Sequence, residues 1–338
     1  MEHAIICPQC NAPLAPSRFA RSVVCSYCGT TVQLDNGLIS AARFHEAFQV
    51  WNSPASYQIP SWISLGESHW ALETCIAHGE TADVHNGRRA RWPTELAIIK
   101  LLRTRQDAAL LDNEWEVLQA LHRSKAPGAD TFTMLLPQPI IHGIISSGAH
   151  VGEGVSIFRW ISGFRYTFDE IIRAYPEGIS PRASIWVWRR ILEVLSFVHH
   201  SGMAHGAVLP SHLLIQENEH GVRLVGYSAA GHLGEKLRTI SHHYESIYPQ
   251  PIGQLTLTEQ LDLVMSARCM IALLGGNPSD GSLPTRVPER LAEIVQRIAS
   301  ANPAGPARED AWTIREELGQ IADEVFGTPQ FIPIVMPS

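Results

Sequence analysis

The sequence lacks several features that mark common classes of protein. No segment reaches the roughly 18 uninterrupted apolar residues that a membrane-spanning helix requires. The opening residues, MEHAIICPQC, contain no basic stretch followed by a long apolar run, as a secretion signal would. Internal repeats and low-complexity segments are absent, which argues against a repeat protein. We therefore expect a cytoplasmic protein that spans no membrane.

The sequence also has no excess of positive charge. Its 26 Lys and Arg residues are outnumbered by 33 Asp and Glu residues, which gives a net charge of −7. A protein that binds a nucleic-acid backbone usually presents a basic face. The charge balance therefore disfavours nucleic acid as a partner.

Length and composition indicate a folded chain of more than one part. The 338 residues exceed the length of a typical single domain, which is roughly 100–200 residues. A hydrophobic fraction of 45%, with nine Trp, is enough to form a buried core. We expect one large globular unit with a small additional module.

Four of the six cysteines lie in the first 28 residues, in two pairs. Cys7 and Cys10 are separated from Cys25 and Cys28 by fourteen residues, and each pair has the Cys-x-x-Cys spacing. Two such turns can place four thiolates tetrahedrally around one zinc ion. Gly29 after the second pair permits the tight turn that this geometry needs.

Residues 5–35 resemble the zinc-ribbon family at all four cysteine positions. The resemblance implies a structural zinc ion that substitutes for a hydrophobic core too small to fold alone. Four cysteines leave no open position for catalysis at the metal. Redox chemistry at a Cys-x-x-Cys pair is the alternative. The remaining cysteines, Cys75 and Cys269, are isolated, and we expect both to be small buried side chains.

The rest of the chain changes from strand patterns to helix patterns near residue 160. Strands are expected at 97–102 and 155–158, and helices at 106–122, 182–200 and 261–274, from the spacing of their apolar residues. The expected organisation is a zinc ribbon (1–38), a helix and linker (39–64), a strand-rich lobe (65–160), a helical lobe (161–327) and an extended tail (328–338).

Several motifs in residues 65–325 resemble those of the protein-kinase family. Lys100 ends an Ala-Ile-Ile-Lys strand like the one whose lysine holds the nucleotide phosphates, and Glu114 resembles its partner on the next helix. Gly79 and Val84 match the loop that covers the phosphates, although the other two glycines of that loop are missing. The resemblance implies an α+β, bilobal kinase-like fold in which these four residues are the candidates for contacting a nucleotide.

The catalytic motifs keep their register but not their chemistry. Residues 204–215 align with the kinase catalytic loop, with Ala207 at the position of the base, Leu209 at that of the lysine and His212 at that of the metal-binding asparagine. Gly226 aligns with the aspartate that supplies the main magnesium ligand. A lone histidine such as His212 is more commonly hydrogen-bonded than metal-bound.

Three other positions match residues that maintain the kinase architecture. The resemblance implies that His205 packs beneath the catalytic loop and that Asp262 accepts backbone hydrogen bonds from that loop. Arg308 resembles the late arginine that anchors the activation segment, with Glu245 as its candidate acidic partner. The pattern retains positions that shape the fold and loses positions that perform catalysis.

The sequence therefore predicts a catalytically inactive kinase-like protein, a pseudokinase, that acts as a regulatory or protein-binding module with a structural zinc ion. We expect no tight, magnesium-dependent binding of ATP. An alternative is an unconventional phosphoryl or nucleotidyl transferase in which Asp83, Glu80 or Glu217 replaces the lost carboxylates.

A second alternative is recruitment to nucleic acid through the zinc ribbon. The first forty residues of the chain contain two basic side chains, Arg18 and Arg21, and two acidic ones, Glu2 and Asp35, so this segment is almost neutral. A neutral segment has little attraction for a phosphate backbone.

Overall fold

A computed structural model describes residues 5–7, 10, 12–14, 22–25, 28, 30–33, 61–91, 94–216, 221–305, 309–330 and 332–336. The chain divides into two compact units, the first formed by residues 1–108 and 139–162 and the second by 109–138 and 163–338. The helix expected at the start of the 39–64 segment lies outside the described residues, as do Gly29, Glu217 and Arg308.

Two short hairpins carry the N-terminal cysteines. In the first, β1 (Ile5–Ile6) pairs with β2 (Pro13–Leu14), and in the second, β3 (Ser22–Val24) pairs with β4 (Thr31–Gln33). Both pairs are antiparallel. One cysteine of each pair directly follows a strand, so the cysteines lie at the turns of the hairpins.

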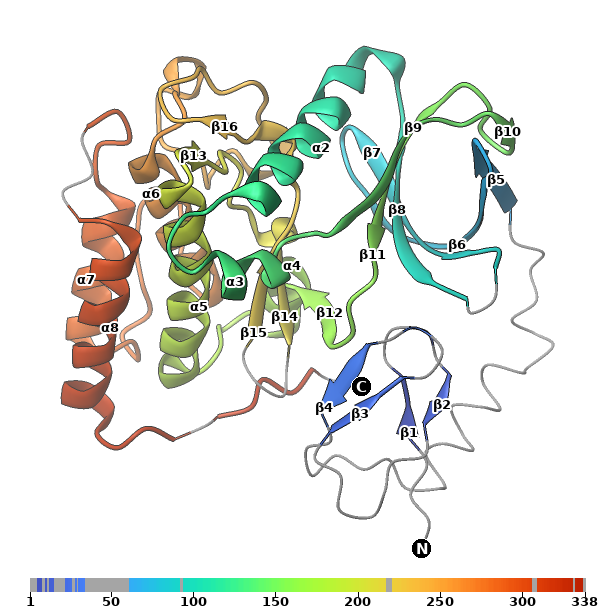
Figure 1. Cartoon of the computed structure of the whole chain (residues 1–338). Helices are drawn as coiled ribbons and strands as arrows, with labels where there is room; N and C mark the ends of the chain where they lie inside the picture. The colour runs from blue at the N-terminus through green and yellow to red at the C-terminus, as the bar shows by residue number, and fades with distance from the viewer. Residues whose placement is uncertain are drawn as a thin grey trace, which may run out of the picture. The chain divides into compact units, whose positions relative to one another are not determined.

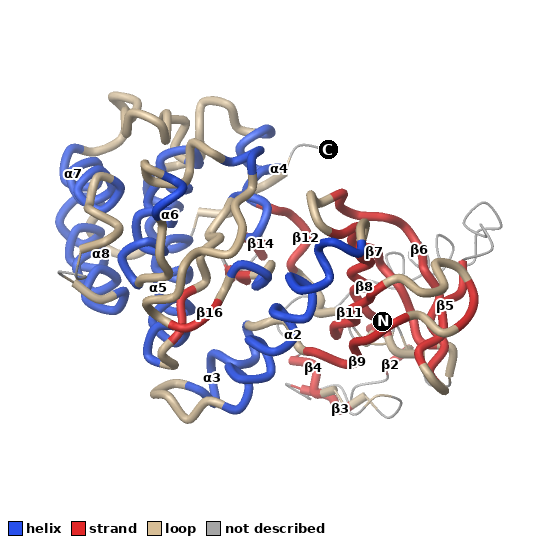
Figure 2. The backbone as a smooth tube through the Cα atoms, turned by 90° about the horizontal axis from the view of Figure 1, so that it is seen from above, coloured by secondary structure: helices blue, strands red, loops and turns tan. Residues whose placement is uncertain are grey.

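A seven-stranded antiparallel sheet forms the main part of the first unit (Figure 2). Its strand order is β10-β5-β6-β7-β8-β11-β9. The strands are β5 (Ser61–Leu65), β6 (Ser68–His78), β7 (Ala82–Arg89), β8 (Leu96–Leu102), β9 (Pro139–Ile144), β10 (Ser147–Gly148) and β11 (Gly154–Arg159). The sheet begins at Ser61, so residues 61–64 are a strand and not the linker that the sequence led us to expect.

One face of this sheet is buried because apolar residues alternate along its strands. On β8 the side chains of Ala97, Ile99 and Leu101 belong to this core, while Lys100 on the other face is half-buried. Trp70 on β6 is fully buried in the same core. The alternation fixes the register, because a slip by one residue would expose the whole apolar set.

The second unit is mainly helical (Figure 1). Its helices are α2 (Ala108–Arg123), whose first residue is counted in the other unit, α3 (Ala129–Phe132), α4 (Phe168–Ala174), α5 (Pro181–His200), α6 (Glu259–Leu273), α7 (Glu289–Ala299) and α8 (Ala311–Phe326). Most residues of helices α5 and α6 are buried, and α5 also packs against α8. None of the described helices is long and apolar enough to cross a membrane.

Side-chain hydrogen bonds fix the ends and the packing of these helices. The Thr258 hydroxyl caps α6 by accepting from the Leu261 amide at 3.0 Å, and a capping box formed by Thr167 and Glu170 begins α4. Between helices, the buried Trp188 indole of α5 donates to the Ser266 hydroxyl of α6 at 3.1 Å. The last of these bonds gives the buried indole N–H the partner that a buried polar group requires.

Short strands complete the second unit. A three-stranded antiparallel sheet is formed by β12 (Phe164–Thr167), β14 (Leu213–Gln216) and β15 (Gly221–Leu224), and β13 (Met203–Ala204) pairs with β16 (Gly231–His232). The chain between β13 and β14 is the segment that resembles a catalytic loop. Both ends of this loop are therefore held by strand pairing, with β16 at one end and with β12 and β15 at the other.

The C-terminal tail packs on the second unit without forming a strand in its described part. Ile334 is buried, and the Tyr175 hydroxyl donates to the Val335 carbonyl. Arg182 likewise donates to the Thr328 carbonyl.

Candidate functional site

Asp262 organises the segment that resembles the catalytic loop. Its carboxylate, which is fully buried on α6, accepts the backbone N–H groups of His205 at 2.7 Å and Gly206 at 2.8 Å. The Nε2 atom of His199, from α5, lies 2.9 Å from the same carboxylate. Charge-assisted hydrogen bonds of this kind are shorter and stronger than neutral ones. One carboxylate thus fixes the backbone of the loop at its first turn.

His205 is fully buried and uses both of its ring nitrogens. Nε2 donates to the Val225 carbonyl at 3.2 Å, and Nδ1 accepts the Ala207 N–H at 3.2 Å. One donor and one acceptor are the pattern of a neutral imidazole. Burial lowers the pKa of His205 to about 3, and the attraction of the Asp262 carboxylate only partly opposes this effect. His205 is therefore a neutral structural side chain.

The two positions that the sequence resemblance aligns with the kinase base and lysine carry buried apolar side chains. Ala207 is 4% exposed and Leu209 is 1% exposed. Neither side chain can accept a proton or contact a phosphate through a charge. Ala207 and Leu209 therefore contribute buried apolar groups to the loop and no charged or proton-accepting group.

His212 and Gly226 fit against each other. The His212 Nδ1 atom donates to the Ala207 carbonyl at 2.8 Å, which holds the ring in place. A Cβ atom added to Gly226 would lie 2.7–2.8 Å from three atoms of this ring. Gly226 also has a φ of 78°, which favours glycine. In this conformation a side chain at position 226 would need the space that His212 occupies.

Helix α2 contacts the segment that follows Gly226. The buried Glu114 carboxylate accepts the Tyr227 N–H at 2.9 Å. The neighbouring Asn113 amide donates to the carbonyls of Ser228, at 3.0 Å, and Ala230, at 2.8 Å. Tyr227 itself is fully buried, and burial raises the pKa of its hydroxyl. Three hydrogen bonds therefore tie α2 to this segment within the second unit.

The other candidate nucleotide-contacting residues belong to the sheet of the first unit. Val84 on β7 lies directly opposite Lys100 on β8, so the two side chains share one face. Gly79 forms the turn between β6 and β7, where its N–H donates to the Ala82 carbonyl at 3.0 Å. Arg103 donates to the Gly79 carbonyl at 2.9 Å. One hydrogen bond within the turn and one from Arg103 therefore close it.

The expectation for Cys75 was wrong. Its side chain is half-buried on β6 and lies 3.7 Å from the Nδ1 atom of His78, because an irregularity in the pairing turns it away from the core. Cys269, in contrast, is fully buried on α6, and burial raises the pKa of its thiol. The expectation for Cys269 is confirmed.

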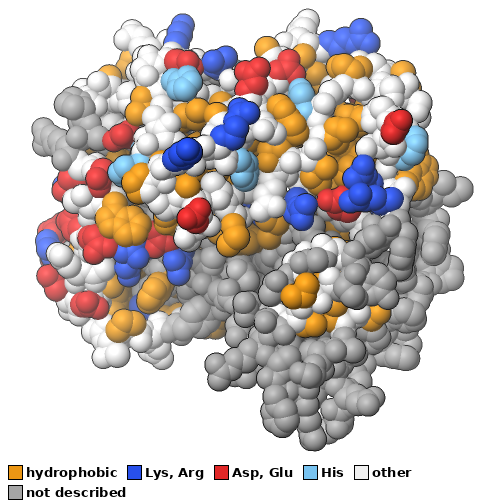
Figure 3. All heavy atoms as spheres, viewed as in Figure 1, with side chains coloured by type: hydrophobic (Ala, Val, Ile, Leu, Met, Phe, Trp, Pro, Cys, Tyr) orange, Lys and Arg blue, Asp and Glu red, His pale blue; other side chains and the backbone are white. Residues whose placement is uncertain are grey.

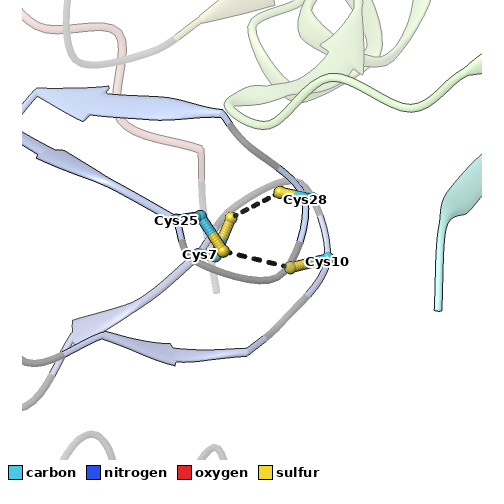
Figure 4. Close-up of side chains that lie close together, drawn as sticks. All are labelled: Cys7, Cys10, Cys25 and Cys28. Atoms are coloured by element: carbon cyan, nitrogen blue, oxygen red, sulfur yellow. Dashed lines mark hydrogen bonds between the residues drawn. The ribbon is translucent and has the colours of Figure 1, made fainter. Parts of the chain in front are cut away.

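The four N-terminal cysteines lie together as a metal site requires (Figure 4). The Sγ atoms of Cys7 and Cys28 are 3.5 Å apart, those of Cys10 and Cys25 are 3.6 Å apart, and all four lie within 4.8 Å of one another. A tetrahedral zinc ion with Zn–S bonds of about 2.3 Å separates its sulfur ligands by roughly 3.8 Å. The donors present therefore fit zinc, which would supply a fixed tetrahedral crosslink between the two hairpins.

The backbone around the cysteines supports the same geometry. The amide of Cys7 donates to the Ala12 carbonyl and that of Cys25 to the Thr30 carbonyl, both at 2.8 Å. Cys28 lies 3.3 Å from the Thr30 hydroxyl. The two halves of the site thus repeat one backbone hydrogen bond, and the second half adds a hydroxyl that can donate to a thiolate.

Two contributors to these sites were not identified from the sequence. Asn113 next to Glu114 had no recognisable motif, and His199 appeared as one more residue at the end of a helix. Glu245, the candidate partner of Arg308, lies with its carboxylate 3.1 Å from the His242 ring. Contacts between side chains more than fifty positions apart, such as His199 and Asp262, leave no local pattern.

Comparisons with known proteins establish the fold. A scan against protein-family models and a search of curated proteins give no match. The structure is similar to a solved structure described as the structure of vaccinia related kinase 3, with a TM-score of 0.59 and 14% sequence identity, over 82% of this chain and 94% of that chain. Similarity at this level of identity shows the fold alone. The expected α+β, bilobal kinase-like fold is therefore confirmed, and the chain has the fold of the protein kinases.

Proposed function

We propose that this protein is a pseudokinase, a kinase-like regulatory or protein-binding module that does not transfer phosphate. The observation that carries the proposal is the packing of His212 against Gly226. In the kinase resemblance these are the two metal-binding positions, and here a ring held by a hydrogen bond fills the space beside a residue without a side chain. The absence of metal ligands at these two positions is therefore accompanied by close packing between them.

The chemistry explains why these positions matter. In phosphoryl transfer, metal ions bridge the phosphates and neutralise developing charge, while a positioned base contributes about 10²–10⁴-fold in rate. Ala207 and Gly226 provide neither a base nor a ligand. These observations support the absence of ordinary kinase turnover.

Regulation through a partner is consistent with the parts that are retained. The hydrogen bonds of Asp262, Asn113 and Glu114 keep the loop and the segment after it in one defined conformation. A protein partner that binds one conformation more tightly than another shifts the population toward it. The proposed function is therefore binding by a shaped surface, with zinc as a structural cofactor of the N-terminal hairpins.

A protein partner fits the surface charge better than nucleic acid does. On the face drawn in Figure 3, Lys and Arg side chains are interspersed with Asp and Glu side chains. A nucleic-acid backbone favours a surface where positive charge is concentrated.

The cytoplasmic location that we propose is supported by cysteines that form no disulfide in this structure.

The test is incubation of the purified full chain with labelled ATP and either magnesium or manganese. We expect no incorporation of label and no rise in melting temperature with millimolar ATP. A ligand at 100 times its Kd stabilises by about 2.7 kcal/mol, so tight binding would be visible as a shift.

Incorporation that is lost in Lys100→Ala but kept in Lys125→Ala, an exposed lysine of the other unit, would overturn the proposal. That result would favour the unconventional transferase. Of the three carboxylates considered for it, Asp83 lies 2.9 Å from the His78 ring and 3.9 Å from Arg103. Glu80 is in the adjoining turn, and Glu217 lies outside the described residues.

A further inference from the structure

A second group of metal-ligating side chains lies at the end of the β6–β7 hairpin. Cys75 and His78 on β6 and Asp83 on β7 place one ligand atom each within 4.8 Å of the others. The Nδ1 atom of His78 is 3.7 Å from the Cys75 Sγ atom and 2.9 Å from the Asp83 Oδ1 atom. All three residues belong to the first unit and none belongs to the N-terminal hairpins.

The pairing of the two strands explains how these side chains come together. Residues three apart on a regular strand point to opposite faces of the sheet. Here Cys75 pairs with His85 and Ala77 with Val84, so β6 has one more residue than β7 at this point. Such a bulge reorients the side chains on either side of it. It brings Cys75 to the face of His78, which lies directly opposite Asp83.

The contacts converge on one nitrogen, and this distinguishes a metal site from a proton relay. In a catalytic Cys-His-Asp arrangement the carboxylate contacts one ring nitrogen and the sulfur contacts the other. Here both the sulfur and the carboxylate lie beside Nδ1 of His78. One N–H group can form a linear hydrogen bond to only one of these atoms, whereas three ligand atoms within 4.8 Å of one another can share a cation.

The spacing also matches a tetrahedral ion. Zinc bonds of about 2.0–2.3 Å to nitrogen, oxygen and sulfur place neighbouring ligands roughly 3.3–3.8 Å apart. The observed separations of 3.7 and 2.9 Å require only a small outward movement of the carboxylate. His78 has a 74% exposed side chain and Asp83 is 28% exposed, so the ring can adjust and an ion can enter from solvent.

We propose that Cys75, His78 and Asp83 form a second zinc site, with water at the fourth position. A thiolate, an imidazole and a carboxylate are the ligand types that zinc accepts. The thiolate and the carboxylate together neutralise the charge of the ion. The zinc links β6 to β7 at the turn that, in the kinase resemblance, covers the nucleotide phosphates.

Arg103 is the cation that already lies near this cluster. Its Nε atom is 3.9 Å from the Asp83 Oδ1 atom, and its NH1 group donates to the Gly79 carbonyl at 2.9 Å. The guanidinium is therefore bound mainly to the turn and can orient the carboxylate from outside the coordination sphere. Its charge and the exposure of His78 make this site weaker than the four-cysteine site.

The test is the zinc content of the full chain, with its N-terminal site loaded, after equilibrium dialysis against micromolar Zn²⁺. We expect two equivalents per chain for the original protein and one equivalent for both Cys75→Ala and Asp83→Asn. The matched control is His242→Ala, which removes an exposed His–Glu pair that has no sulfur, and it should keep two equivalents. Cobalt gives a second readout, because the thiolate-to-metal absorption of the second Co²⁺ equivalent should disappear in Cys75→Ala.

A single equivalent in the original protein would overturn the proposal. Retention of the second equivalent in Cys75→Ala or Asp83→Asn would also overturn it, because the ion would then be bound elsewhere. Circular dichroism of each variant checks its folding, and the remaining tightly bound equivalent shows that the N-terminal site is intact.

Discussion

Adding one methyl group at Gly226 tests the packing on which the proposed function depends. Gly226 has a φ of 78°, a conformation that costs an L-residue about 1–2 kcal/mol. A Cβ atom there would also lie 2.7 Å from the His212 ring, and such overpacking typically costs about 1–3 kcal/mol. We therefore expect Gly226→Ala to lower the free energy of unfolding by about 2–5 kcal/mol.

Gly202 provides the matched control for backbone strain. Its φ is 76°, and nothing lies within 4 Å of an added Cβ atom. Gly202→Ala should therefore show only the conformational cost. The measurement is urea unfolding followed by circular dichroism, with the slope m checked so that a change of midpoint reports stability.

A double variant separates the contact with His212 from other effects. His212→Ala alone removes the hydrogen bond to the Ala207 carbonyl and should cost about 0.5–1.5 kcal/mol. His212→Ala combined with Gly226→Ala should be more stable than the sum of the two single changes, because the added methyl group then has space. Coupling below about 0.5 kcal/mol, the range expected for independent sites, would refute the reasoning. Equal losses in Gly226→Ala and Gly202→Ala would refute it as well.

Three further predictions concern the loop and the N-terminal site. Asp262→Ala leaves two buried backbone N–H groups without an acceptor, and each unsatisfied group costs about 1–3 kcal/mol. Thermal melts should show a decrease in stability of that order. Because the pKa of His205 is about 3 in the folded state and near 6.5 in the unfolded chain, its contribution to stability is full above pH 6.5 and is lost as pH falls toward 3. The free energy of unfolding should fall by about 1.4 kcal/mol per pH unit in this range. His205→Gln should therefore show a flatter pH dependence of unfolding, and an unchanged dependence would contradict a neutral His205. Chelation of zinc, or Cys25→Ser, should raise amide hydrogen exchange in residues 5–33 and leave α5 and α6 protected, and equal exchange in both would contradict a local role for the metal.

The sequence predicted the elements whose apolar pattern is long and regular. The strand over 97–102 and the helix over 182–200 are present as β8 and α5, within two residues at each end. Their apolar residues alternate or recur at helical spacing over several turns, so no tertiary information is needed. The metal site formed by the four cysteines was equally predictable, because the spacing of the cysteines in the sequence indicates it directly.

The cluster around Cys75 could not be predicted because it depends on a β-bulge. Counting residues along a regular strand places Cys75 and His78 on opposite faces, and only the extra residue on β6 reverses this. The fit between His212 and Gly226 was also invisible, although both positions were identified. Their contact depends on a positive φ and on a hydrogen bond to the Ala207 carbonyl, neither of which has a pattern in the sequence.

The three contacts that meet at Asp262 separate the shape of the loop from its composition. A carboxylate more than fifty residues further along the chain accepts the N–H groups of His205 and Gly206, so this turn does not depend on the side chains at positions 207 and 209. Substitutions at positions 207 and 209 can then occur without altering this turn, whereas His212 holds the Ala207 carbonyl by a hydrogen bond of its own. As sequences diverge, such a loop therefore remains recognisable by its backbone after its residues have ceased to match.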